Sequence, residues 1–362
     1  MRLQTKVTTL IALIVATSYD VSAFTATTTH PNTYAKRSIT TELHAIGVLA
    51  RKAKEMSVRK YVEDGVEENV MAKVKEMKSG LDSVSLDGDE AGPLQQALTK
   101  RKGTISLIAE YKRRLMDDKA GYIDEIFSPK IMSPTFREFG ATALAVMADE
   151  RMGGCTYEDV AMFVEEQNKA QGDMPGPLPV ISSDLIVDEL QLAQAAAVGA
   201  KAVTITLGVV SAEKVNFYLK AAKTLDLEVI VNVATAEQAQ AAVDAGATLI
   251  CVAGVDGAEN KKAVIADLIV PEGNKAVCKI ANIVAKNNQQ LEEVEEAWIC
   301  RDAGFNAVWV SDALYKGGSD PVEHPGAIIK SMIAKSSVKW ASPKARSGKG
   351  EGAREYLGDI LM

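Results

Sequence analysis

The sequence predicts an α/β protein in which eight parallel strands alternate with helices and close into a barrel. Four times along the chain, a segment with helical spacing ends at a glycine, and a short run rich in alanine and β-branched residues follows at once. These glycines are Gly140, Gly199, Gly246 and Gly304. Glycine ends helices readily because it adopts the left-handed conformation without a Cβ clash. Runs that are apolar on both faces are typical of parallel strands covered by helices.

The distances between these glycines predict the other strands. Successive glycines are separated by roughly twice the length of one strand-helix unit, so a further strand is expected within each interval and before the first. The expected ranges are 104–112, 178–184, 227–233 and 275–282, with helices over 188–198, 211–225 and 236–245. This alternation predicts a (βα)8 TIM barrel. An open doubly wound sheet is the alternative, and the lack of a Gly-x-Gly-x-x-Gly motif after the first strand argues against it.

The barrel is expected to occupy residues 101–334, with extensions at both ends. Residues 44–100 combine charged residues with apolar positions at helical spacing, which predicts an N-terminal helical extension. Residues 335–362 begin with a stretch rich in lysine, serine and glycine, which predicts a flexible C-terminal tail.

The first residues have the composition of targeting signals. In residues 1–23, basic residues precede an apolar run and small residues suited to cleavage, which predicts a signal peptide. Residues 24–43 are rich in threonine and have no acidic residue before Glu42, as in transit peptides. Together these segments resemble the two-part plastid address of algae with secondary plastids, and predict a location in the plastid stroma. Ordinary secretion is the alternative, but cysteines that look reduced argue against it.

Composition narrows the partners of the protein. A formal net charge of -7 gives no support to binding of nucleic acid or of an anionic membrane. No segment of the expected mature chain is long and apolar enough to span a bilayer. The cysteines are far apart and lack metal-site spacing, so we expect buried free thiols and neither metal nor cofactor. These cysteines are Cys155, Cys251, Cys278 and Cys300. This composition is also compatible with a protein partner.

The first strand carries two charged residues on one face. Strand alternation places Glu110 and Lys112 on the same side as Ile108. Two opposite charges facing into a barrel are costly to desolvate unless they pair or meet a ligand. They are therefore candidates for function, and a structural ion pair at the top of the barrel is an equally open reading. No histidine lies on an expected strand, so proton transfer in the barrel would need carboxylates, lysines or tyrosines.

Motifs at three successive strand ends resemble one enzyme family. They are Ile-Ala-Glu-Tyr-Lys at 108–112, Asp-Glu-Arg-Met-Gly-Gly at 149–154 and Ser-Asp-Leu-Ile-Val-Asp-Glu-Leu-Gln at 183–191. Over residues 48–333 the chain resembles the indole-3-glycerol-phosphate synthases of tryptophan biosynthesis. The resemblance implies a carboxy-lyase that closes an indole ring on a carboxyphenylamino-deoxyribulose phosphate, with loss of carbon dioxide and water. It also implies a small phosphorylated metabolite as ligand.

The resemblance implies roles for several residues, and some of them have changed. Glu110 and Lys112 match the family's substrate-positioning pair. The family's general-acid lysine falls on Ser183, which precedes Asp184, and its general-base glutamate falls on Asn232. A hydroxyl is far too weak an acid, and an amide is not a useful base. The phosphate-binding turn after the eighth strand falls on Ser311 and Asp312, where the family's glycine is lost.

Three functional hypotheses follow from this pattern. The first is a working synthase in which Lys112, Asp184 or Asp312 has taken over proton transfer. The second is a barrel without the chemistry, a pseudoenzyme that acts as a binding, regulatory or structural subunit. The third is a new reaction that uses these residues together with Glu110, because one fold hosts many chemistries. The two substitutions favour a divergent family member whose decarboxylating ring closure is impaired or lost.

Overall fold

The computed structural model describes residues 33–86, 91–99, 104–114, 128–270, 276–286, 291–315 and 325–334. The expected signal peptide at 1–23 and the tail at 335–362 lie outside these ranges. Of the transit-like segment at 24–43, only residues from 33 onward are described, and they are helical.

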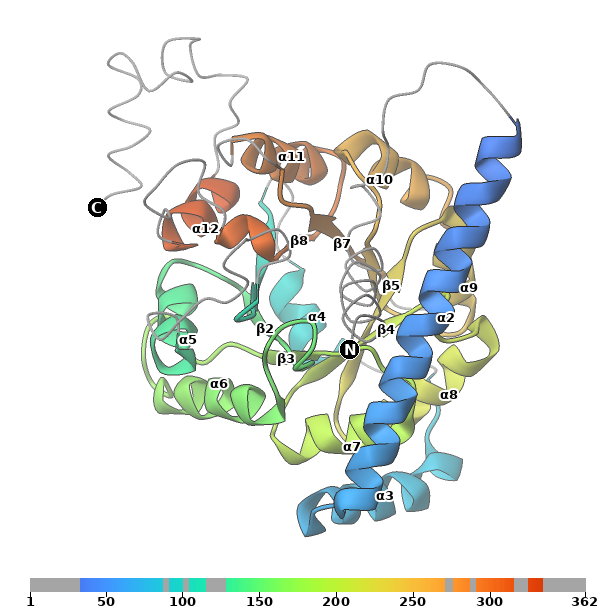
Figure 1. The fold of residues 1–362 in the computed structure, drawn as a ribbon. Coiled ribbons are helices and arrows are strands. Elements are labelled where there is room, and N and C mark those ends of the chain that lie inside the picture. Colours follow the sequence, from blue (N-terminus) through green and yellow to red (C-terminus); the bar gives the residue numbers. More distant parts are fainter. Residues whose placement is uncertain are drawn as a thin grey trace, which may run out of the picture.

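Eight parallel strands form a closed barrel in chain order, β1 to β8, which confirms the TIM barrel (Figure 1). The strands are β1 Ser106–Tyr111, β2 Ala143–Met147, β3 Val180–Ser183, β4 Ala202–Thr206, β5 Glu228–Val233, β6 Leu249–Val252, β7 Cys278–Ile283 and β8 Ala307–Val310. Closure comes from pairing of β1 with β8, where Ala109 lies opposite Val310. An open sheet would leave those two strands as edges.

Helices surround the strands, as Figure 1 shows. They are α5 Pro129–Glu138, α6 Tyr157–Lys169, α7 Glu189–Ala197, α8 Ala212–Lys223, α9 Ala236–Asp244, α10 Ala258–Ile265, α11 Leu291–Asp302 and α12 Pro325–Ile333. A short 3-10 helix, η4 (Asp312–Leu314), follows β8. The glycines that predicted β2, β4, β6 and β8 all have positive φ, between 83° and 99°. These positions therefore use the conformational freedom that is special to glycine.

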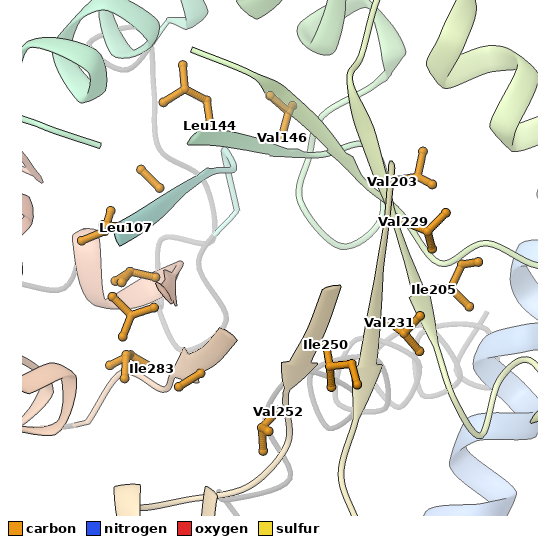
Figure 2. Close-up of a cluster of buried hydrophobic side chains, with 14 of the residues drawn as sticks. Leu107, Leu144, Val146, Val203, Ile205, Val229, Val231, Ile250, Val252 and Ile283 are labelled. Atoms are coloured by element: carbon orange, nitrogen blue, oxygen red, sulfur yellow. The ribbon is translucent and has the colours of Figure 1, made fainter. Parts of the chain in front are cut away.

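Side chains alternate between the two faces of each strand. Those on the outer face pack against the helices in a large apolar core, and Figure 2 labels ten of them, including Leu107, Val203 and Ile250. The inner face is filled by a separate apolar cluster. Each odd-numbered strand contributes one isoleucine to it; these are Ile108, Ile181, Ile230 and Ile280. The barrel interior is thus a packed core at this depth, as in other TIM barrels.

The N-terminal extension consists of helices α2 Thr33–Asp64, α3 Glu68–Gly80 and α4 Pro93–Leu98, with a 3-10 turn, η2 Leu81–Ser83. Helix α2 begins inside the segment expected to be transit-like and runs past the edge of the barrel (Figure 1). Helix α3 packs against α7 and α8. Within the described ranges, no helix combines the length and apolar character that crossing a bilayer requires.

Helix α4 closes the amino-terminal end of the barrel. Its residues Leu94 and Leu98 are fully buried and belong to the same apolar cluster as the inner strand residues. The carboxylate of Glu228, at the start of β5, accepts hydrogen bonds from the backbone amides of Leu94 at 2.5 Å and Gln95 at 3.0 Å. A carboxylate at a helix N-terminus satisfies amides that have no partner within the helix. In the described part of the chain, α4 therefore covers the amino-terminal end of the barrel interior, and a functional site is expected at the carboxyl end.

Candidate functional site

Four inward-facing polar residues lie two positions beyond the isoleucines on the odd-numbered strands. We call them the polar layer: Glu110 on β1, Ser183 on β3, Asn232 on β5 and Asn282 on β7. Alternate strands contribute side chains to one layer of a TIM barrel, and the carboxyl ends of the strands form its active site. All four are buried, with exposed fractions between 0% and 6%. The layer therefore occupies the position expected of catalytic groups.

Two members of the polar layer have buried atoms without a hydrogen-bond partner among the described residues. They are Oε1 of Glu110 and the hydroxyl of Ser183. Asn232 donates from Nδ2 to the hydroxyl of Thr206 at 3.3 Å. Two further unpartnered groups lie on β8 or just after it, the indole N–H of Trp309 and the hydroxyl of Ser311. Buried polar groups are costly without partners, so these atoms are the candidate ligand contacts of the site.

Lys112 forms a buried ion pair with Asp312. Asp312 begins η4 directly after β8, and closure of the barrel brings the end of β8 beside the end of β1. The side chains of Lys112 and Asp312 are 5% and 9% exposed. The sequence left open whether the charges on β1 are structural or meet a ligand. The structure gives Lys112 a structural partner and leaves Glu110 Oε1 without one.

Asp184 follows Ser183, the last residue of β3, and its side chain bonds to groups outside the polar layer. Its carboxylate contacts Lys54 Nζ at 2.5 Å and accepts hydrogen bonds from Tyr157 at 3.0 Å and Gln191 at 2.8 Å. Asp184 therefore holds helix α2 and the start of α7 at the end of β3. The catalytic role of Asp184 stays a prediction, and the contacts that the structure shows for its carboxylate are structural ones.

Lys54 was not predicted as a site residue, yet it reaches the rim of the barrel from α2. Its amine also contacts Asp149, after β2, at 2.9 Å. Burial opposes the charge of Lys54, but attraction and hydrogen bonds from Asp184 and Asp149 outweigh it and raise the pKa above its ordinary value. An ammonium with a raised pKa is a poorer proton donor at neutral pH. Lys54 therefore connects α2 to the barrel through ion pairs with Asp149 and Asp184.

An open cavity of 650 Å³ lies between α2 and the ends of β2 and β3. Lys54, Asp149, Tyr157 and Asp184 are among its lining residues. Burial and the nearby Asp184 carboxylate raise the pKa of Tyr157 well above its ordinary value. No member of the polar layer is among the residues that line this cavity, so the two sites are distinct.

The family profile of indole-3-glycerol phosphate synthase matches residues 58–314. The chain belongs to this family. The synthase of Leptospira interrogans is 32% identical over 157 residues, which cover 43% of this chain and 57% of that protein. The synthase of Chlorobium phaeovibrioides is 26% identical over 259 residues, which cover 71% of this chain and 90% of that protein. For the synthase of Streptomyces griseus the match is 25% over 301 residues, covering 82% of this chain and all of the relative.

Membership of the synthase family indicates which residues of the polar layer correspond to the family's proton-transfer groups. The resemblance aligns the family's acid and base with Ser183 and Asn232, and the structure places both in this layer. Asn282 was not predicted as a site residue, although its spacing of two from Ile280 signals an inward position. Ser311 and Asp312 follow β8 as expected. The described layer thus retains one ionisable side chain, Glu110.

Proposed function

We propose that this chain is an indole-3-glycerol-phosphate synthase homologue in which the decarboxylating ring closure is impaired or lost. One observation carries the proposal: the polar layer presents a hydroxyl and an amide at Ser183 and Asn232, where the family uses an ammonium and a carboxylate. General acid and base groups each contribute on the order of 10²- to 10⁴-fold to a rate. Replacement of both should therefore lower turnover by about 10⁴-fold or more.

The geometry offers few substitutes for the missing groups. Asp184 is bonded to Lys54, Tyr157 and Gln191, which lie outside the layer. The amine of Lys54 is shared between two carboxylates. Lys261, which is fully buried, pairs with Glu296 between α10 and α11. None of these groups is available at the inward ends of β3 and β5.

The direct test is to incubate the purified chain with the family's carboxyphenylamino-deoxyribulose phosphate and to measure the formation of indole-glycerol phosphate. We expect no product above the buffer background. The double variant Ser183→Lys with Asn232→Glu restores both proton-transfer groups and should recover measurable turnover. Wild-type turnover at a rate typical of enzymes, about 1 s⁻¹ or more, would refute the proposal.

A matched control distinguishes the effect of restored proton transfer from the effect of larger side chains at positions 183 and 232. The double variant Ser183→Met with Asn232→Gln introduces side chains of nearly the same size as lysine and glutamate, but neither carries a charge. It should fold as well as the Lys/Glu variant and remain inactive. Equal activity of the two variants would show that packing, and not proton transfer, is the lesion.

The ion pair between Lys112 and Asp312 supports a second candidate. It places an ammonium and a carboxylate beside Glu110 at the carboxyl end of the barrel, which are the two kinds of group that proton transfer needs. In this reading the synthase remains active through different residues. Residual wild-type turnover that disappears in Lys112→Met, while Lys54→Met retains it, would favour this candidate over loss of activity.

For location, the proposal is the plastid stroma, reached through a signal peptide at residues 1–23 and a transit-like segment at 24–43. The order of basic, apolar and small residues followed by threonine-rich sequence supports it. Residues 1–43 fused to a fluorescent protein should direct it into the plastid of an alga with secondary plastids. Fluorescence in the medium or the secretory pathway would support ordinary secretion instead.

A further inference from the structure

We infer that the polar layer is selective for a small hydroxylated amine and against the phosphorylated carboxylate that its family processes. This inference rests on the proposed loss of ring closure. It follows from the charge of the inward-facing groups and from the kinds of hydrogen bond that they leave unmade.

The charge around the layer has a negative excess. Two carboxylates, Glu110 and Asp312, and one amine, Lys112, are the buried ionisable groups at this end of the described barrel interior. The amine is already paired with Asp312, so Glu110 is the one of these three groups without an ion-pair partner among the described residues. An anionic ligand would face a like charge in a low-dielectric setting, which is unfavourable, whereas an ammonium would supply the missing counter-charge.

The unpartnered atoms specify a ligand with both donors and acceptors. Glu110 Oε1 can only accept a hydrogen bond while it is ionised, and the indole N–H of Trp309 can only donate one. The hydroxyls of Ser183 and Ser311 can do either. The ionised phosphate or carboxylate group of a ligand offers acceptors, and that group cannot donate the hydrogen bond that an ionised Glu110 needs. A chain of hydroxyls that ends in an ammonium carries donors for Glu110, acceptors for Trp309, and groups that can bond to either serine.

The region that holds phosphate in the family, as the resemblance implies, also disfavours an anion here. Asp312 follows Ser311 at the turn after β8, and its carboxylate forms an ion pair with the amine of Lys112. The glycine that would allow close approach of backbone amides to an anion is replaced by Ser311. A phosphate at this turn would have to displace a buried carboxylate from its partner, at a cost in free energy.

Three matched probes test the inference: glucamine, sorbitol and sorbitol phosphate, which differ in carrying an ammonium, a hydroxyl or a phosphate at one end. Binding to the full chain is measured by calorimetric titration. We expect glucamine to bind about tenfold more tightly than sorbitol, because one charge-assisted hydrogen bond provides a ratio of at least this size. Sorbitol phosphate should bind most weakly. Preference for sorbitol phosphate, or no binding of glucamine at about 10 mM, would overturn the inference.

Two variants locate the effect in the polar layer. Glu110→Gln keeps the size of the side chain and removes its charge, so it should abolish the preference for glucamine over sorbitol. If that variant fails to fold, Ser183→Lys provides the second test, because an ammonium in the layer should reverse the preference toward sorbitol phosphate. An unchanged order of affinities in a folded variant would contradict the inference. The proposed function is tested by a different result: product formation by the wild-type chain in the ring-closure assay would refute it.

Discussion

Replacing Lys54 with methionine tests whether the N-terminal extension is fastened to the barrel by charge. The substitution keeps the length of the side chain but removes its amine from Asp184 and Asp149. The carboxylate of Asp184 is 1% exposed and that of Asp149 is 14% exposed. Removing one partner of a buried ion pair costs about 3–5 kcal/mol. Asp184 keeps the hydrogen bonds of Tyr157 and Gln191, so we expect a loss of about 3 kcal/mol.

The assay is urea unfolding followed by circular dichroism, together with the thermal midpoint. For a barrel of this size, each kcal/mol lowers the midpoint by roughly 2–4 °C, so a fall of roughly 6–12 °C is expected. Lys73→Met is the matched control, because Lys73 forms an exposed pair with Glu76 within α3. Exposed pairs contribute at most about 1 kcal/mol. A loss in Lys54→Met no larger than in Lys73→Met would refute the reasoning.

The pH dependence of this effect follows from the direction of the pKa shift. Folding raises the pKa of Lys54, so its contribution is complete below the ordinary value of 10.5 and is lost as pH rises toward the folded value. The difference in unfolding free energy between wild type and Lys54→Met should therefore be constant near neutral pH and shrink above 10.5.

Three further predictions concern other parts of the barrel. Lys112→Met should cost about 3 kcal/mol in urea unfolding by leaving Asp312 buried and unpaired, and adding Asp312→Asn should recover part of it; an additive loss would contradict the pairing. Gly326→Ala should cost about 1–3 kcal/mol, because the new Cβ would lie 2.3 Å from Phe139 Cγ; an unchanged thermal midpoint would show that α12 shifts freely. All four cysteines are buried, and burial raises the pKa of Cys155, Cys278 and Cys300 to about 12, so an aromatic disulfide reagent at neutral pH should label them only after unfolding.

The fold was predictable from the sequence because its signals are local. Each strand needs a short apolar run, and four of them follow a glycine that ends a helix with positive φ. The expected strand at 227–233 agrees with β5 to within one residue, and the expected helix at 236–245 with α9. The helical extension was also expected, but not the earlier start of α2 at Thr33.

The candidate site was predictable only in part, because its geometry depends on contacts between distant segments. Alternation within β1 placed Glu110 and Lys112 on one face, but only closure of the barrel brings Lys112 to Asp312. The direction of the Asp184 side chain relative to Ser183 depends on where β3 ends, and the sequence does not define that end. The contact between Lys54 and Asp184 joins the extension to the third strand, and no local pattern indicates it.

Helix α4 also has a consequence for where this protein can be cut. Residues at 93–98, which precede the first strand, fill the base of the cylinder and rest on a carboxylate of the fifth strand. A fragment that starts at 104 would expose that apolar floor to solvent and remove the amides of Leu94 and Gln95 from Glu228. The smallest self-sufficient folding unit therefore includes sequence upstream of the eight repeats, and α4 is as much a part of the barrel as any strand.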